Sequence, residues 1–221
     1  MVNIIKNHIP MLTKARPCTV RVPSSITIHN TGNTKASSGA LNHSKYMNGA
    51  GCHKYASYNY VVDDLYVIEL IPPDEVSYHA GDGAKGKGNH FSISIEICEN
   101  SDGDLVKATN NAVELVRWLL KEYSIKPEKI YQHNHWSGKD CPQRLRKGEP
   151  YSWEEFLKLC TEEREEPMKY YEVLTDIPEG ELRDNVSKLI QSGFLRGTGS
   201  GLHLSEDMVR LITILTRAKV L

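Results

Sequence analysis

The sequence lacks any apolar stretch near the ~20 residues that a membrane-spanning helix needs, so we expect no membrane-embedded segment. The first ten residues also lack the apolar core of a signal peptide, because Lys6, Asn7, His8 and Pro10 interrupt it. We therefore expect synthesis in the reducing cytoplasm without a signal peptide. The five cysteines are odd in number and untidily spaced, which argues against a disulfide framework. They are better interpreted as buried thiols, one of which is a candidate metal ligand.

The chain also lacks a strong excess of either charge. Its formal net charge at pH 7 is −1. Neither the first 160 residues nor the remainder carries the surplus of Lys and Arg that marks a nucleic-acid-binding protein. Hydrophobic residues make up 39% and charged residues 25% of the chain, which is typical of a soluble globular protein. Nucleic acid is therefore not expected as a partner.

Residues 1–160 alternate between strand-like and helix-like patterns. This alternation predicts a mixed central β-sheet flanked by helices, an α/β or α+β layer architecture. One strand-like segment alternates strictly, with isoleucines on one face and Ser92, Ser94 and Glu96 on the other. Asp63 and Asp64 separate two other segments, which predicts a hairpin. The strand-like segments are residues 25–30, 59–62, 66–71 and 90–98.

Two helices are predicted in the second half of this region. Asn111 followed by Glu114 has the pattern of an N-cap with an acidic residue three positions later. Apolar residues at helical spacing follow, and Pro127 bars continuation. Ser152 followed by Glu155 predicts the start of a further helix.

Residues 161–169 form a charged run with a proline, which we interpret as a linker. Residues 170–221 are predicted to form a small helical module. An amphipathic pattern covers 181–191, a glycine-rich turn is expected at 197–201, and Ser205 is expected to cap the last helix. A unit of this size has little core of its own, so its apolar residues are expected to bury one another or a partner subunit in a homodimer.

Three residues stand out as candidate metal ligands. His29 ends the first predicted strand, and His133 precedes Cys141 by eight residues in the segment YQHNHWSGKDCP. Two imidazoles and a thiolate would fill three tetrahedral positions of Zn²⁺ and leave the fourth open to water, as catalytic zinc requires. The alternative for each histidine alone is an ordinary hydrogen-bonded residue. His135 is a rival ligand, because strand alternation would place it on the same face as His133.

The segments ITIHNTGN, SYHAGDG, SISIEIC and HNHWSGKDCP occur in this order between about residues 20 and 160. This pattern resembles the type-2 N-acetylmuramoyl-L-alanine amidases, a family that includes phage endolysins and bacterial autolysins and is akin to peptidoglycan recognition proteins. The resemblance implies zinc held by His29, His133 and Cys141. It also implies hydrolysis of the lactyl amide bond between N-acetylmuramic acid and L-alanine in bacterial peptidoglycan.

The resemblance further assigns roles to residues outside the ligand set. Glu96 would be the general acid/base, and Lys139 the cation beside the metal. Tyr58 matches a tyrosine that some relatives use, whereas Asn59 stands where many have a histidine, so the role of this strand end is open. The residues implied to contact substrate are His79, Asn30 and Tyr58.

Without a signal peptide, the resemblance implies a phage or prophage endolysin that reaches the wall after holin-type release. Residues 170–221 would then bind the cell wall. Three other functions are considered, of which one is an amidase fold with a regulatory tail whose main task is partner binding. A non-catalytic recognition protein of the same fold usually lacks the cysteine ligand, which is present here as Cys141. A cysteine peptidase is disfavoured, because Cys141 between Asp140 and Pro142 does not look like a cysteine at a helix N-terminus.

Overall fold

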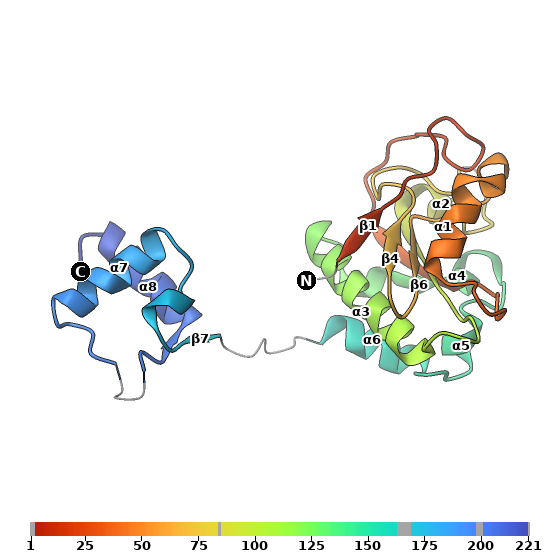
Figure 1. The fold of residues 1–221 in the computed structure, drawn as a ribbon. Coiled ribbons are helices and arrows are strands. Elements are labelled where there is room, and N and C mark those ends of the chain that lie inside the picture. The colour runs from red at the N-terminus through yellow and green to blue at the C-terminus, as the bar shows by residue number, and fades with distance from the viewer. Residues whose placement is uncertain (1–2, 84, 163–168, 198–200, 221) are drawn as a thin grey trace. The chain divides into compact units, whose positions relative to one another are not determined.

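The structure, a computed structural model, describes residues 3–83, 85–162, 169–197 and 201–220. The chain divides into two units, Met1–Glu162 and Glu163–Leu221 (Figure 1). Most of the predicted linker and of the glycine-rich turn, residues 163–168 and 198–200, lies outside the described residues. Among the helices that the structure does describe, none has the length and apolarity to span a membrane.

The first unit contains a six-stranded sheet with the strand order β1-β4-β3-β5-β2-β6. Only β3 and β4 pair antiparallel, as the predicted hairpin, and all other pairs are parallel. The mixed sheet expected from the sequence is therefore confirmed. The strands are β1 (Ile4–Lys6), β2 (Ser25–Asn30), β3 (Tyr60–Val62), β4 (Val67–Glu69), β5 (Ser92–Ile97) and β6 (Ile130–Gln132).

Strand β5 is shorter than the sequence predicts. Residues Lys87–Phe91 form a short helix, α2, and leave Phe91 41% exposed instead of on the buried face. The helix forms because the Asp82 carboxylate accepts hydrogen bonds from the backbone N–H groups of Gly88 and Asn89. These local bonds compete with the strand, so strict alternation extended the prediction two residues too far.

Helices α3 (Leu105–Glu122) and α6 (Trp153–Thr161) cover one face of the sheet (Figure 1). Ser152 and Glu155 form the predicted capping box of α6. The predicted start of α3 is wrong: Asp104 is the N-cap and accepts from the Lys107 N–H, so the helix begins before Asn111. The buried residues of this face include Ile26, Ile28, Ile93, Ile95, Ile97, Ala112, Leu115, Val116, Leu119 and Phe156.

The other face of the sheet is covered in part by α1 (Ala40–Asn48), which is followed by a 3-10 turn at Ala50–His53. Here Val61 and Ile68 of the hairpin pack with Ala40 and Met47 in a second apolar cluster. The part of this face formed by β2 and β5 is polar instead, because Thr27, His29, Ser94 and Glu96 alternate with the isoleucines of the opposite face.

The second unit contains α7 (Glu181–Gln191) and α8 (Glu206–Arg217), as the sequence predicts. The Ser205 side chain caps α8 by accepting from the Met208 N–H. Two very short strands, β7 (Tyr170–Tyr171) and β8 (Leu204–Ser205), pair antiparallel and were not predicted, and a 3-10 turn covers Leu174–Asp176. The core of this unit consists of Tyr171, Ile177, Val186, Leu204 and Val209, with Leu182, Ile190 and Ile212 packed against it.

Candidate metal centre

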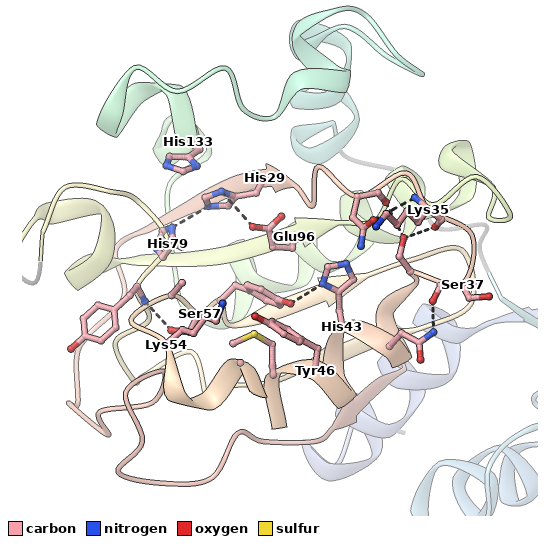
Figure 2. Close-up of a pocket in the computed structure, with 18 of the residues that line it drawn as sticks. His29, Lys35, Ser37, His43, Tyr46, Lys54, Ser57, His79, Glu96 and His133 are labelled. Atoms are coloured by element: carbon pink, nitrogen blue, oxygen red, sulfur yellow. Dashed lines mark hydrogen bonds and ion pairs between the residues drawn. The ribbon is translucent and has the colours of Figure 1, made fainter. Parts of the chain in front are cut away.

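Strands β2 and β5 place His29 beside Glu96. The two strands run parallel in a register that pairs these residues directly, so both side chains emerge on the same polar face. The Nδ1 atom of His29 lies 3.8 Å from Oε1 of Glu96. The imidazole of His29 is almost fully buried, and Figure 2 shows it between His79 and Glu96.

A tight reversal of the chain brings Cys141 back beside His133. His133 opens the short helix α4 (His133–Ser137), which ends at Gly138 with φ 74°. This left-handed conformation suits glycine and turns the chain sharply. Asn134 holds the segment that returns after Gly138. Its backbone N–H donates to Cys141 O, and its Nδ2 donates to Lys139 O.

The helix α4 is itself fixed against the sheet. The Trp136 indole N–H donates to Thr27 Oγ1 over 2.9 Å, which ties the helix to β2. Gly88 permits the close approach of Trp136, because a Cβ at Gly88 would lie 2.5 Å from the Ala80 side chain and 2.8 Å from the indole. A short helix that would be unstable alone is thus positioned by its neighbours.

His29, His133 and Cys141 form a buried cluster in which the three potential ligand atoms all lie within 4.8 Å of one another. Cys141 Sγ is 3.8 Å from His29 Nδ1. His133 Nε2 donates to Ala80 O over 3.1 Å, whereas its Nδ1 is buried and has no hydrogen-bond partner. A buried nitrogen without a partner is costly unless it serves another purpose. Two imidazoles and a thiol are the donor set that suits Zn²⁺, so these residues fit that metal.

Burial keeps the protein atoms of the cluster uncharged. It lowers the pKa of His29 well below its usual value, with further contributions from His79 and His133. Burial also lowers the pKa of His133 and raises the pKa of the Cys141 thiol to about 12. Neutral imidazoles are the form that binds metal, and metal binding would displace the thiol proton.

Glu96 is a buried carboxyl group with an unusual environment. Desolvation raises its pKa to about 8, against the opposing effect of Lys139. Its Oε2 atom is buried and has no hydrogen-bond partner. A carboxyl group held in this way can exchange protons near neutral pH, as a general acid or base must.

The cluster opens into a cleft of about 640 Å³, and Lys139 is part of its lining. The lining also includes His29, His79, Glu96 and His133 (Figure 2). Gly81 and Gly83 border an adjoining pocket, so the segment that carries these two glycines flanks the cleft. The cleft extends from the metal-ligand cluster along α1 and the loop before it. Its lining there includes Lys35, His43 and Tyr46, and Lys54 and Tyr58 line it from the segment before β3.

Tyr58 lies in the cleft, and its hydroxyl shares a 3.1 Å hydrogen bond with His43 Nδ1. Burial, with a contribution from Glu96, raises the pKa of Tyr58 well above its usual value. The sequence analysis did not identify His43, Lys35 or Lys54, because nothing local marks a histidine on a helix or a loop lysine as part of a site. The pairing of His43 with Tyr58 depends on how α1 packs.

Asn30 and Asn59, which the sequence analysis discussed, are both held inside the fold. Asn30 is buried, and its side chain accepts from the Arg144 N–H and donates to Ile97 O; it is not among the residues that line the cleft. Asn59 is completely buried, and its Oδ1 accepts from Arg21, Ser77 and Ser94. The residue at position 59 therefore supports β3 and β5 from within.

One premise of the sequence analysis is wrong. His135 does not share a strand face with His133, because α4 begins at His133; His135 is exposed and stacks on Tyr131 at 4.4 Å. Cys141 lies before the N-cap of the short helix α5 (Gln143–Arg146), which is Pro142, and so is not itself at the helix N-terminus. The raised pKa of this thiol also differs from the lowered value that an activated cysteine nucleophile needs.

Known proteins are similar to this chain in sequence and in fold. The chain is 44% identical over 145 residues to the N-acetylmuramoyl-L-alanine amidase CwlH of Bacillus subtilis (strain 168), covering 66% of this chain and 57% of CwlH. It is 43% identical over 145 residues to the N-acetylmuramoyl-L-alanine amidase XlyA of the same organism, covering 66% of this chain and 48% of XlyA. The chain thus spans about half the length of these curated relatives.

Solved structures agree with these similarities. The catalytic domain of XlyA matches with a TM-score of 0.67 and 40% identity, over 72% of this chain and 99% of that chain. The structure of PlyL matches with a TM-score of 0.64 and 34% identity, over 73% of this chain and 99% of that chain. Residues 19–144, which contain the whole candidate centre, match the family model Amidase_2, described as N-acetylmuramoyl-L-alanine amidase. The chain therefore belongs to the Amidase_2 family of N-acetylmuramoyl-L-alanine amidases.

Proposed function

We propose that this chain is a zinc-dependent N-acetylmuramoyl-L-alanine amidase that hydrolyses the lactyl amide between N-acetylmuramic acid and L-alanine in bacterial peptidoglycan. The observation that carries the proposal is the buried His29, His133 and Cys141 cluster beside Glu96 at the end of a cleft. Family membership and the names of the relatives support the choice of bond and polymer.

The residues around the cluster have complementary tasks in this reaction. His29, His133 and Cys141 would hold zinc, which supplies Lewis-acid chemistry by polarising a carbonyl and acidifying water. Glu96 would accept a proton from the attacking water and pass it to the departing alanine nitrogen, because its Oε2 has no competing partner. Lys139 lines the same cleft, and its ammonium group would stabilise negative charge on the carbonyl oxygen.

Two measurements on the purified full chain test this function. Elemental analysis after zinc-replete purification should find one zinc per chain. Digestion of purified walls should release new alanine amino groups without new reducing sugar ends. Reducing ends that rise in step with lysis would instead indicate a glycosidase, and zinc binding without released amines would indicate a non-catalytic recognition protein.

We further propose that the enzyme is a phage or prophage endolysin and that residues 170–221 bind the cell wall. Tethering of this kind raises the local substrate concentration without changing the active site. The core of the second unit, which includes Tyr171, Val186 and Val209, shows that its helices bury apolar residues against one another. Several apolar residues of α8 stay exposed, Met208, Leu211 and Ile214 among them.

A chain that ends after residue 162 tests the tether. It should keep its zinc and its turnover on small soluble wall fragments, and should bind whole walls more weakly than the full chain. Equal binding to walls would refute the tether. Sedimentation of the full and the shortened chain gives their masses in solution and tests whether residues 170–221 form a homodimer. A dimeric full chain and a monomeric shortened chain would place the dimer contact in the second unit.

A further inference from the structure

His79 lies directly behind His29 and not simply along the wall of the cleft. Its Nδ1 is 3.0 Å from His29 Nε2, and the two rings meet edge to face (Figure 2). Its own Nε2 is 3.2 Å from the carbonyl oxygen of Ser92. Both ring nitrogens of His79 are therefore engaged within the protein. A histidine whose nitrogens are both occupied in this way is poorly suited to direct hydrogen bonding with a substrate.

The hydrogen bonds that link Ser92, His79 and His29 determine which ring nitrogens carry protons. A backbone carbonyl can only accept, so His79 Nε2 must carry a hydrogen and donate to Ser92 O. In a neutral ring the other nitrogen, Nδ1, is then an acceptor. His29 must donate to it from Nε2, which leaves the lone pair of His29 on Nδ1. That atom is the one that faces Cys141 and Glu96.

His133, the second histidine of the proposed ligand set, is oriented by Ala80, the residue that follows His79. His133 Nε2 donates to the carbonyl oxygen of Ala80, and its Nδ1 is the buried nitrogen without a partner. His79 and Ala80 thus each engage the Nε2 of one ligand imidazole, and both ligands present Nδ1 to the cluster. We call these two consecutive residues the His79–Ala80 brace.

Asn89 holds the brace in place. Its Oδ1 accepts from the backbone N–H groups of both His79 and Ala80, at 2.7 and 2.8 Å, and its Nδ2 donates to Gly83 O. The Arg21 guanidinium donates to Ser92 O at 2.7 Å, on the same oxygen that His79 uses. A positive charge on the His79 ring would stand beside this guanidinium, so the ring is neutral.

We propose that His79 is a positioning residue that fixes His29 in its Nε2–H tautomer, so that His29 offers Nδ1 to the metal. This inference rests on the zinc site of the proposed function. It gives His79 a place in the outer shell of the site, where a partner of a ligand histidine fixes ring orientation and raises ligand basicity. His79 was expected to contact substrate, and the proposal replaces that role.

Zinc affinity of full-length variants tests the proposal. His79→Leu removes the acceptor for His29 Nε2–H and should weaken zinc binding by about 10-fold to 100-fold, measured by competition with a chromogenic chelator. His79→Asn should retain most of the affinity, because its side-chain oxygen can occupy the place of Nδ1 and accept the same hydrogen. His90→Leu is the matched control, since His90 contacts Phe91 in α2 and should leave zinc binding unchanged.

A second measurement needs neither a variant of His79 nor zinc. Long-range ¹H–¹⁵N correlation spectra of the metal-free protein, with the His29 signals assigned through His29→Gln, should show His29 protonated at Nε2 only. A His29 ring protonated at Nδ1, or a His79→Leu variant that binds zinc as tightly as the unaltered chain, would overturn the proposal. If the unaltered chain binds no zinc at all, the proposed function fails instead, and the tautomer measurement still decides the role of His79.

Discussion

The two faces of strands β2 and β5 follow opposite rules. On one face, isoleucines such as Ile28 and Ile95 pack against α3 and α6 and are completely buried. On the other, His29 is buried and Glu96 is mostly buried, and the Oε2 atom of Glu96 has no hydrogen-bond partner. The first face gains stability from burial, whereas the second gives up some stability to hold reactive groups away from water.

The difference separates stability from chemistry within a single sheet. Substitutions on the apolar face should change the free energy of unfolding and leave the reaction of the folded molecules intact. Substitutions on the polar face should impair the reaction and leave the free energy of unfolding nearly unchanged. The following variants test that separation.

The largest effect is expected from Cys141→Ser. Loss of the one sulfur ligand in the cluster should release zinc and abolish amide hydrolysis together, because serine is a poor zinc ligand. Metal content and release of alanine amines are the measurements. Cys160→Ala is the matched control: this cysteine lies in the apolar core, so the variant should lose some stability and keep its zinc. A Cys141→Ser protein that retains full zinc would show that the thiol is not a ligand.

Ile95→Ala should produce the largest effect on stability. The side chain is completely buried on the apolar face, and truncations of this kind cost about 2–5 kcal/mol of unfolding free energy. Urea unfolding measures the loss, and zinc content and turnover per folded molecule should stay unchanged. The milder Ile95→Val should cost about 0.5–1.5 kcal/mol. A variant that stays stable but turns over slowly would break the proposed division between the two faces.

Glu96→Gln should reduce turnover by at least ~100-fold, or about 2.7 kcal/mol of activation free energy, since a proton carrier is lost. Zinc content should not change, and the thermal midpoint should not fall, because the amide removes a buried carboxyl whose ionisation burial disfavours. Calorimetry and initial rates of amine release are the measurements. Full lytic activity would mean that Glu96 has only a structural role.

Glu75→Gln should have the smallest effect and contrasts with Glu96. The Glu75 carboxylate receives two hydrogen bonds from the Arg16 guanidinium, which lower its pKa. A lowered pKa in the folded state contributes stability above the unfolded value near 4.5, and this stability is lost as the pH falls through the folded pKa. The variant should therefore cost about 1 kcal/mol at pH 7 and progressively less below pH ~4.5. The free energy of unfolding, measured at pH 7 and below pH ~4.5, checks this, with the exposed Glu128→Gln as a control. An equal loss of unfolding free energy at the two pH values would contradict it.

Periodicity in the sequence predicted most of the apolar face. The isoleucines of β2 and β5, the helical spacing after Asn111 and the capping box at Ser152 are local patterns, and local patterns survive in the folded chain. Errors arose where a nearby side chain outside the repeat decided the outcome. Asp104 capped α3 earlier than the Asn111 pattern suggested, and Asp82 turned the first residues of the predicted β5 into a helix.

The candidate site was predictable only in part for the same reason. The spacing of His133 and Cys141 and the family resemblance pointed to the cluster that the structure brings together. The placement of His79 behind His29 and of His43 beside Tyr58 depends on contacts between residues that are 50 and 15 positions apart. No short pattern records such contacts. The strands β7 and β8 are two residues each, too short to leave a periodic signal.

The parallel register of β2 and β5 has a consequence for how this site can fail and change. His29 and Glu96 are opposite partners in a ladder of six residue pairs, so their separation is determined by backbone hydrogen bonds. Slippage by a single residue would turn every side chain of a strand to the other face, so the two groups cannot drift apart gradually. Their alignment is all-or-none, and heat should abolish it only when the sheet itself separates. The loops around the cleft, in contrast, can lengthen or change composition without moving the pair, which leaves substrate preference free to vary on an unchanged reactive centre.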